Sequence, residues 1–370
     1  MRQETERRPD GRLLRYYFAD GAGPAEGVVP PAPAGRRSAL LVTGGAGYVA
    51  GPLVARLVAA GHHVLVLDDL STSSGQTLPA GVELVRARLG DAVVLRELFG
   101  DFRIGGVFHF AADSRVGESM QAPLQYYRHN VREALTLLEE AVAAGCPPFI
   151  FSSSAAVYGI PESVPVREDA VPRPINPYGE TKAAFERALH WAGVGHGLPF
   201  AALRYFNAAG AEGPWEPKQP ETHLIPNVLA AAADGATLRV FGQDYPTPDG
   251  TAVRDYIHVA DLAEGHLAAL RHLRAGGEAG AFNLGSGVGW SVAQVIAAAE
   301  RVTGRRVRWE GAPRRAGDPP SLVADPGKAE RLLGWKACRS SLTEVVGDAW
   351  TALRRAASPA PGPAAGAGPA

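Results

Sequence analysis

Short apolar runs recur along the first half of the chain and predict buried β-strands. They lie at residues 39–42, 64–67, 82–85, 107–110, 149–151 and 200–203. Helix-length segments separate several of these runs, for example at residues 53–60, 131–144 and 178–192. Strands that alternate with helices indicate right-handed βαβ units, and therefore a parallel sheet covered on both faces. The pattern predicts a doubly wound α/β domain of the Rossmann type.

The alternation becomes less regular after Asn207 and predicts a second, smaller α+β domain. Helices are expected at residues 223–233 and 261–273, and short strands at 238–241, 281–284 and 307–309. Helix-start signals occur at Ser291, at Asp325 followed by Pro326, and near Ser341. We expect the first domain at residues 38–208 and the second at 209–355, with some segments of the second returning to the first.

Both ends of the chain are rich in glycine, proline and alanine. Residues 1–37 contain GAGPAEG and PPAPAGRR, and residues 356–370 are of low complexity. Such segments do not supply a packed apolar face, so we expect flexible tails at both ends. A docking segment is the alternative for the N-terminal tail. It would be built on Leu13, Leu14, Tyr16, Tyr17 and Phe18.

Composition and charge narrow the class of protein. The 370 residues carry a formal net charge of -1, which gives no electrostatic attraction to nucleic acid or to an anionic membrane. No run approaches the ~20 apolar residues of a membrane span. Two cysteines are too few for a disulfide framework, which favours a reducing cytoplasm. The histidines are not spaced as metal ligands, so no metal is expected.

The segment TGGAGYVAG, at residues 43–51, predicts a dinucleotide site. Gly44, Gly47 and Ala50 follow an apolar strand and open a helix, where small residues let the backbone approach a pyrophosphate at the helix N-terminus. Asp68 ends the next strand and is expected to bind the adenosine ribose hydroxyls, which favours NAD over NADP. Asp91, after the third strand, is expected to reach the adenine. The alternative is a glycine turn that binds nothing.

A serine, a tyrosine and a lysine predict proton transfer beside that dinucleotide. Ser154 follows a strand and is expected at the carboxyl end of the sheet, where ligands bind in such folds. Tyr178 and Lys182 are four residues apart and therefore lie on one face of a helix. A free tyrosine has a pKa of about 10. We expect the ammonium group and the positive nicotinamide to lower it, although a surface helix pair would have the same spacing.

The chain resembles the extended short-chain dehydrogenases/reductases, and among them the UDP-glucose 4-epimerases. The resemblance covers residues 38–350. It rests on segments that occur in the family's order along the chain, among them VTGGAGYVAG, FSSSAAVYG, NPYGETK, LRYFNAAG, VRDYIHVADL and PRRAGDPPSLVAD. It implies that Tyr178 and Ser154 remove the proton of the sugar 4-hydroxyl while C4 gives its hydride to tightly held NAD. The 4-keto sugar then rotates and takes the hydride back on its other face, so that UDP-glucose and UDP-galactose interconvert. The family also suggests a homodimer through helices near residues 120–143 and 178–192.

The resemblance also implies which residues contact the ligands. The cofactor would be lined by Gly44, Gly47, Tyr48, Val49, Asp68, Asp91, Phe110, Ala111, Asn130, Ser152, Tyr178, Lys182 and Tyr205. The UDP-sugar would contact Ser154, Tyr178, Asn207, His223, Leu224, Phe241, Arg254, Tyr256, Arg315 and Asp318. Two arginines suit a pyrophosphate because the guanidinium fork matches phosphate oxygens. Lys182 would also hold the nicotinamide ribose, and Phe241 and Leu224 could enclose the uracil.

Several positions depart from the family pattern. Ser114 replaces a lysine near the cofactor phosphate, and Ala156 replaces a threonine after the catalytic serine. Leu322 stands beside the expected position of the sugar 2-substituent, where relatives carry a tyrosine or a smaller residue. Leucine is smaller than tyrosine, so the hypothesis is that it admits an N-acetyl group. Alanine at positions 155 and 156 argues against the dehydratases and decarboxylases of this fold, which need acids there. Epimerisation of another UDP-sugar stays open, as does a non-catalytic NAD-binding scaffold.

Overall fold

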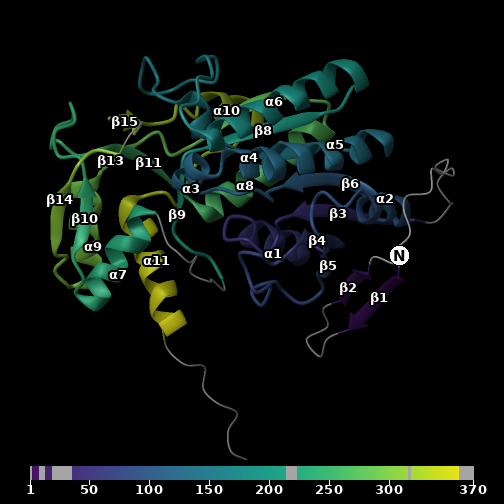
Figure 1. The fold of residues 1–370 in the computed structure, drawn as a ribbon, viewed down its shortest axis with the longest axis horizontal. Coiled ribbons are helices and arrows are strands. Elements are labelled where there is room, and N and C mark those ends of the chain that lie inside the picture. Colours follow the sequence, from purple (N-terminus) through teal and green to yellow (C-terminus); the bar gives the residue numbers. More distant parts are fainter. Residues whose placement is uncertain (1, 8–12, 19–35, 214–222, 316–317, 358–370) are drawn as a thin grey trace, which may run out of the picture.

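A computed structural model of the chain describes residues 2–7, 13–18, 36–213, 223–315 and 318–357. They form two lobes, of which the larger is built on a nine-stranded sheet (Figure 1). The strand order is β1-β2-β5-β4-β3-β6-β7-β8-β12. All neighbouring strands are parallel except β1 and β2. The bounds are β1 Arg2–Arg7, β2 Leu13–Phe18, β3 Arg37–Thr43, β4 Val64–Asp68, β5 Glu83–Arg86, β6 Phe102–His109, β7 Phe149–Ser154, β8 Phe200–Tyr205 and β12 Gly280–Leu284.

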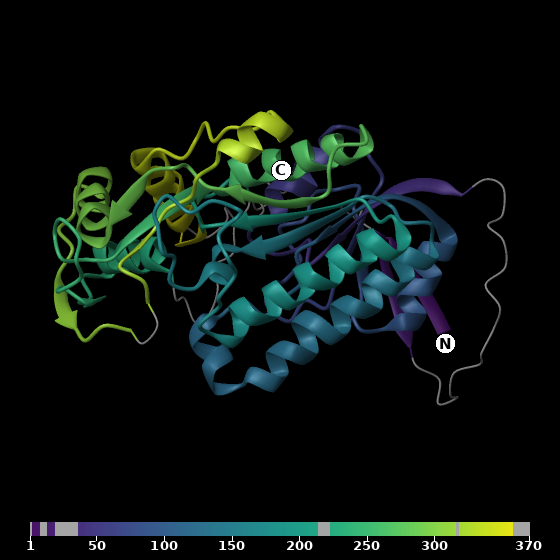
Figure 2. The same ribbon diagram turned by 90° about the horizontal axis from the view of Figure 1, so that it is seen from above.

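Helices cover both faces of this sheet, as the alternating pattern predicts. One face carries α1 Gly51–Ala59, α8 Val259–Arg274 and α10 Gly327–Leu333. The other carries α2 Ala92–Asp101, α5 Glu133–Ala143 and α6 Pro177–His196. Figure 2 shows α5 and α6 running side by side along that second face. The expected doubly wound parallel fold is confirmed.

Each face of the sheet buries its own apolar cluster. Successive side chains of a strand point to opposite faces, so Ile150 packs with the α1 and α8 side while Phe151 packs with the α5 and α6 side. Shorter elements lie in the connections that follow β6 and β7. These are α3 Val116–Gln121, α4 Pro123–Tyr127, the π-helical turn η1 Arg128–Arg132 and the 3₁₀ turn η2 Ala155–Tyr158.

The smaller lobe mixes short strands and helices, which confirms the expected α+β class. Its strands are β9 Asn207–Ala209, β10 Leu238–Phe241, β11 Val253–His258, β13 Gly289–Ser291, β14 Trp309–Ala312 and β15 Ser321–Leu322. Its helices are α7 Leu224–Asp234, α9 Val292–Thr303 and α11 Leu342–Ala357. Ser291 caps α9 with a reciprocal capping box, and the Ser341 hydroxyl accepts from the backbone of Glu344, so both helix-start predictions are confirmed.

The structure differs from the sequence expectation at three places. Strands β1 and β2 form within the segment expected as a flexible tail, where β2 pairs in parallel with β5. The sequence LLRYYF of β2 contains three aromatic residues, which favour strands, whereas the expectation rested on the glycine- and proline-rich stretch that follows. The strand expected at residues 307–309 begins instead at Trp309, and the helix signalled by Asp325 begins at Gly327. Residues 1, 8–12, 19–35 and 358–370 of the two expected tails lie outside the described residues.

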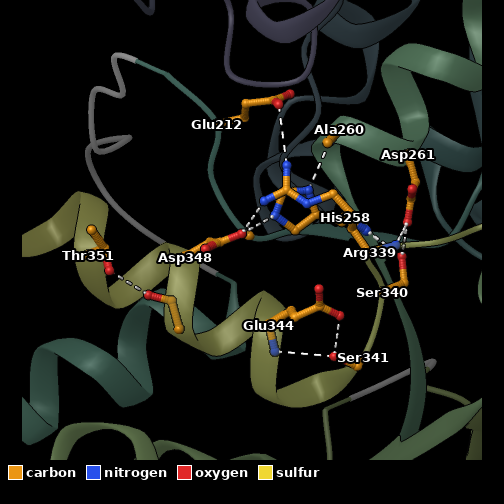
Figure 3. A network of polar contacts seen from close by, with 12 residues as sticks. Glu212, His258, Ala260, Asp261, Arg339, Ser340, Ser341, Glu344, Asp348 and Thr351 are labelled. Atoms are coloured by element: carbon orange, nitrogen blue, oxygen red, sulfur yellow. Dashed lines mark hydrogen bonds and ion pairs between the residues drawn. The ribbon is translucent and has the colours of Figure 1, made fainter.

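A polar network joins the two lobes beside α8 and α11 (Figure 3). The guanidinium group of Arg339 donates to Asp348 at 2.8 Å and to Glu212 at 3.3 Å. Glu212 also accepts from Arg56 of α1 at 2.6 Å. The Nδ1 atom of His258 accepts from the first turn of α8, so Nε2 carries the proton and donates to Asp348 at 3.1 Å. The network therefore connects α1 of the larger lobe to α11, the last helix.

Candidate active site

The turn between β3 and α1 approaches the neighbouring strand closely. Gly44 has a φ of 68°, and a Cβ atom there would lie 2.6 Å from the backbone nitrogen of Ala111. The backbone N–H groups of Phe110 and Ala111 both donate to the carbonyl oxygen of Thr43. Ala50 at the N-cap of α1 has no side-chain acceptor for the first N–H groups of the helix. The N-terminus of α1, where the helix dipole favours an anion, therefore follows directly on a tight glycine turn.

Asp68 lies at the end of β4 and faces this turn. Its Oδ2 atom accepts from the backbone of Ala46 at 3.0 Å, and Oδ1 accepts from Leu70 at 2.9 Å. Burial raises the pKa of this carboxyl group, and the two backbone hydrogen bonds oppose the rise. Asp91 occupies a different kind of position, because its side chain caps the N-terminus of α2. The structure thus gives Asp91 a helix-capping role whether or not it also meets an adenine.

Ser154, Tyr178 and Lys182 converge at the carboxyl end of β7. Ser154 is the last residue of the strand, and Tyr178 and Lys182 extend from the first turns of α6. Asn176 caps this helix by accepting from Gly179 at 2.8 Å, which fixes where Tyr178 begins. Gly179 admits the close approach, since a Cβ atom there would lie 2.5 Å from the carbonyl oxygen of Ala156. A hydrogen bond joins the Tyr178 and Ser154 side chains.

Lys182 is buried beneath the tyrosine, with only 3% of its surface exposed. Its Nζ atom donates to the carbonyl oxygen of Ser152 at 2.8 Å and lies 4.8 Å from the centre of the Phe151 ring. Burial lowers the pKa of Lys182 to about 7, and the negative charge of Glu186 opposes that fall. The ammonium group lies 5.8 Å from the Tyr178 ring centre. A cation is thus held within reach of the phenol.

The protein groups alone do not make the phenol acidic, and the expected lowering of its pKa by Lys182 and a bound nicotinamide together stays a prediction. Burial raises the pKa of Tyr178, and the hydrogen bond with Ser154 only partly offsets the rise. Desolvation of the phenolate is the larger of these two effects. Lowering the pKa of Tyr178 therefore requires a further positive charge in the cleft.

Other predicted cofactor residues surround this centre. The Ser152 hydroxyl hydrogen-bonds the phenol of Tyr205, and Phe110 stacks on His266 with ring centres 4.5 Å apart. Asn130 lies in the π-helical turn η1, buried, and its side chain bonds the backbone of Asp113. The phenol of Tyr48 donates to the carbonyl oxygen of Gly210 at 2.6 Å. Val49 packs against the apolar cluster of the α1 face.

A second group of predicted residues gathers on the smaller lobe. Arg254 pairs with Asp318, whose backbone N–H donates to the carbonyl oxygen of Arg315 at 3.2 Å. The guanidinium group of Arg315 lies 4.2 Å from the centre of the Phe241 ring. Tyr256 is buried, and burial raises the pKa of its phenol. These residues form one charged and aromatic surface on β10, β11 and the segment after β14.

Asn207 and Leu322 place that surface next to the serine turn. Asn207 pairs with Tyr256 along β9 and β11, only two residues beyond Tyr205 of the main sheet. Leu322 pairs with Arg254 in β15 and packs against the apolar cluster of the η2 turn, which includes Ala155 and Val157. The predicted catalytic and nucleotide residues are therefore adjacent.

The remaining predicted positions are less closely tied to this centre. Leu224 begins α7 and packs against the cluster that contains Tyr256, whereas His223 before it is exposed. Ser114 lies in the loop after β6, and the backbone of Ala156 donates to the Ser154 hydroxyl at 3.1 Å.

Sequence reasoning missed three polar residues of this centre. Glu186 and Arg204 form a buried ion pair directly behind β7, with an Nη2 to Oε2 distance of 2.6 Å. Asp255 is completely buried and accepts four hydrogen bonds from Ser286, Gly287 and Ala324. Glu186 follows Tyr178 and Lys182 at the same four-residue spacing, a signal that could have identified it.

Comparison with known proteins decides the family. Residues 40–285 match the model of the NAD dependent epimerase/dehydratase family. The chain belongs to this family. The family match spans the dinucleotide turn, the serine strand and the tyrosine helix described above. Within the described part of the chain, no helix is both long and apolar enough to cross a bilayer. The same residues contain no group of three or more His, Cys, Asp and Glu side chains placed to hold a metal ion.

Relatives of this epimerase/dehydratase family member include curated and structurally characterised proteins. The UDP-glucose 4-epimerase of Streptomyces lividans is 47% identical over 313 residues, covering 84% of this chain and 94% of its own length. That of Lacticaseibacillus casei is 44% identical over 315 residues, covering 84% and 95%. The crystal structure of the Brucella ovis enzyme in complex with NAD is 41% identical, with a TM-score of 0.81 over 85% of this chain and 98% of that one.

Proposed function

We propose that this protein uses bound NAD to interconvert UDP-glucose and UDP-galactose through a 4-keto intermediate. The observation that carries the proposal is the convergence of Ser154, Tyr178 and Lys182 at the carboxyl end of β7. The relatives named UDP-glucose 4-epimerase, at 44% and 47% identity, support the choice of substrate.

The residues of the β3–α1 turn fit a dinucleotide. The close contact at Gly44 leaves no room for a side chain, and the N-terminus of α1 follows the turn, where the helix dipole favours a pyrophosphate. Asp68 would bind the adenosine ribose through its carboxylate, while Tyr205 and Lys182 would lie toward the nicotinamide end. Bound NAD would supply a reversible hydride acceptor for C4 of the sugar. Its positive ring would also add the charge that Tyr178 lacks in the protein alone.

Proton movement would be the task of the chain's own residues. The phenolate of Tyr178 would accept the proton of the sugar 4-hydroxyl, and Ser154 would orient that hydroxyl through the hydrogen bond it shares with Tyr178. Lys182 would stabilise the phenolate from below. After the 4-keto sugar has rotated and taken back its hydride, the same phenol would return the proton, so no net oxidation occurs.

The smaller lobe would anchor UDP while the sugar rotates. Arg254 and Arg315 would bind the pyrophosphate, since two guanidinium groups match its oxygens. Asp318 would keep Arg254 oriented through their ion pair. Phe241 and Leu224 would enclose the uracil, and Asn207 would contact the nucleotide from β9. His223, Tyr256 and Ser154 complete the substrate residues of the proposal.

We further propose that the protein acts in galactose metabolism in the cytoplasm as a homodimer. Four apolar side chains of α3, α4 and α6 are more than half exposed, namely Met120, Leu124, Trp191 and Val194. Burial of this surface against a second copy would remove a large apolar area from water. Light scattering should give the mass of a dimer, and Leu124→Glu combined with Trp191→Glu should give a monomer. A monomeric unsubstituted protein would reject this part of the proposal.

A substrate panel tests the central proposal. The purified protein would be offered UDP-hexoses, UDP-N-acetylhexosamines and UDP-pentoses, with products resolved by NMR. We expect UDP-glucose and UDP-galactose to interconvert. If only an N-acetylated sugar or a pentose is turned over, the proposed substrate is wrong but the proposed 4-epimerisation chemistry still holds. Absence of any product, together with bound NAD that no UDP-sugar reduces, would indicate a non-catalytic scaffold.

A further inference from the structure

A buried carboxylate lies one helical turn behind Lys182. Glu186 extends from α6 toward the sheet and is bound there by two neighbouring strands. Its Oε1 atom accepts from the Ser153 hydroxyl at 2.5 Å, and both carboxylate oxygens accept from Arg204 at 2.6–3.2 Å. Ser153 and Arg204 are register partners on β7 and β8. The carboxylate therefore joins α6, β7 and β8 at a single point.

The same ion pair reaches the turn that follows Ser154. The Nη1 atom of Arg204 donates to the phenol of Tyr158 at 3.0 Å, and this phenol donates to Asn283 of β12 at 2.6 Å. Tyr158 ends the η2 turn that begins directly after Ser154. Glu186 thus contacts β7 through Ser153, and its partner Arg204 contacts the η2 turn through Tyr158. A full set of hydrogen bonds compensates the cost of burying both charges.

We propose that Glu186 is a positioning residue that holds the end of β7 in register with α6 through Ser153 and Arg204, and so keeps the Ser152 carbonyl oxygen in contact with Lys182. This inference rests on the proposed roles of Tyr178 and Lys182. Ser153 is anchored between Ser152, whose carbonyl oxygen receives the ammonium group, and Ser154, which bonds the phenol. Consecutive residues of a strand move together. The hydrogen bond between Glu186 and Ser153 therefore sets the positions of the Ser152 contact with Lys182 and of the Ser154 contact with Tyr178.

Glu186 also provides the negative charge that favours the Lys182 ammonium group. The other polar groups around this lysine are Tyr178 on α6, the fully buried His109 on β6, and Tyr205 on β8. Burial keeps His109 neutral by lowering its pKa to about 3, and burial raises the pKa of both phenols. Arg204 is positive but already paired. Among the described residues, Glu186 is thus the anion that offsets the desolvation of Lys182.

Lysine-specific NMR offers a direct test. The chain has four lysines, at positions 182, 218, 328 and 336, so an isotope-labelled sample gives few signals, and Lys182→Arg identifies the relevant one. In Glu186→Gln, which preserves the shape but removes the charge, we expect Lys182 to titrate about one pH unit lower. The alkaline limb of kcat should move in the same direction. Glu180→Gln is the matched control, because Glu180 lies on the same helix but pairs with Arg187 at the surface.

The outcomes separate this inference from the proposed function. An unchanged Lys182 titration in a folded Glu186→Gln protein, or a loss of activity equal at every pH, would overturn the electrostatic role. Ser153→Ala tests positioning without removing a charge, and should lower kcat by about tenfold with UDP affinity unchanged. Activity within twofold of the unsubstituted protein would overturn that role. An active Tyr178→Phe protein would instead contradict the proposed function itself.

Discussion

The Oδ2 atom of Asp68 accepts a hydrogen bond from the backbone N–H of Ala46 at 3.0 Å. The acid that ends β4 is therefore attached to the glycine turn at which a dinucleotide would bind. This contact fixes the carboxylate beside the turn, where it can accept two ribose hydroxyls without a large movement. A 2′-phosphate at the same place would meet a negative charge.

Replacement of Asp68 should weaken NAD binding. We expect Asp68→Asn to bind NAD about 10- to 100-fold less tightly, since charge-assisted hydrogen bonds to the ribose are lost. Discrimination against NADP should fall as well, because the repulsion is removed. Calorimetric titration of the cofactor-free protein with both dinucleotides would measure this. Asp69→Asn, at the exposed neighbouring position, should retain normal NAD affinity, and equal losses in both variants would argue against a specific role.

Removal of the Tyr178 hydroxyl should abolish most of the catalysis. Tyr178→Phe retains the ring but offers no group to carry the proton, so kcat should fall by about 10²- to 10⁴-fold. UDP affinity should stay nearly unchanged, because the nucleotide residues lie on the smaller lobe. Steady-state kinetics and UDP titration together separate these effects. Near-normal turnover would show that another group moves the proton.

Asp261 is expected to be a major contributor to stability at the junction of the lobes. Its buried carboxylate accepts from the backbone of Cys338 and Arg339 and from the Ser340 hydroxyl (Figure 3). Asp261→Asn would present an amide group to these donors and should lower the free energy of unfolding by about 2–4 kcal/mol. Urea unfolding measures the loss. Asp234→Asn, at an exposed position, should change the free energy of unfolding by less than about 0.5 kcal/mol.

Acid should destabilise the protein through two buried histidines. Burial lowers the pKa of His109 to about 3 and that of His266 to about 4, whereas both would titrate near 6.5 in the unfolded chain. Below pH ~6.5 the unfolded chain takes up protons that the folded protein cannot, so stability decreases as the pH falls toward 4. Each histidine contributes a slope of up to about 1.4 kcal/mol per pH unit.

Urea unfolding between pH 7 and 5 would measure this slope, and His266→Phe should make it shallower. Phenylalanine preserves the stacking on Phe110 but has no site for a proton. His62→Asn changes an exposed residue and should leave the slope as it is. A His266→Phe slope equal to that of the unsubstituted protein would contradict the assignment.

Much of this architecture could be predicted from the sequence because its signals are local. The run at residues 149–151 and the following serines predict β7 and place Ser154 at its carboxyl end, and the structure has both. The same run predicts that Ser152 and Ser153 are exposed, and this is wrong, because both are buried. The partnership of Glu186 with Ser153 and Arg204 could not be predicted in the same way. It depends on which strands become neighbours in the sheet, a relation that no local pattern encodes.

Electrostatics were harder to predict than topology. The spacing of Tyr178 and Lys182 correctly indicates a shared helical face, yet the degree of burial decides the direction of the pKa shift. Desolvation is the largest influence on the pKa of both groups. Burial of this kind follows from the complete packing and is not visible in a pair of residues.

The apolar layer beneath α1 has a consequence for how the newly made chain can fold. This layer includes Phe282 and Leu284 of β12, and also Ala329 and Trp335 from still later in the chain. A ribosome that has released only the first 208 residues has therefore supplied a sheet with one side covered by α1 alone and its last strand missing. The nucleotide-binding half must wait for nearly the whole polypeptide to emerge, and the two lobes are expected to mature together.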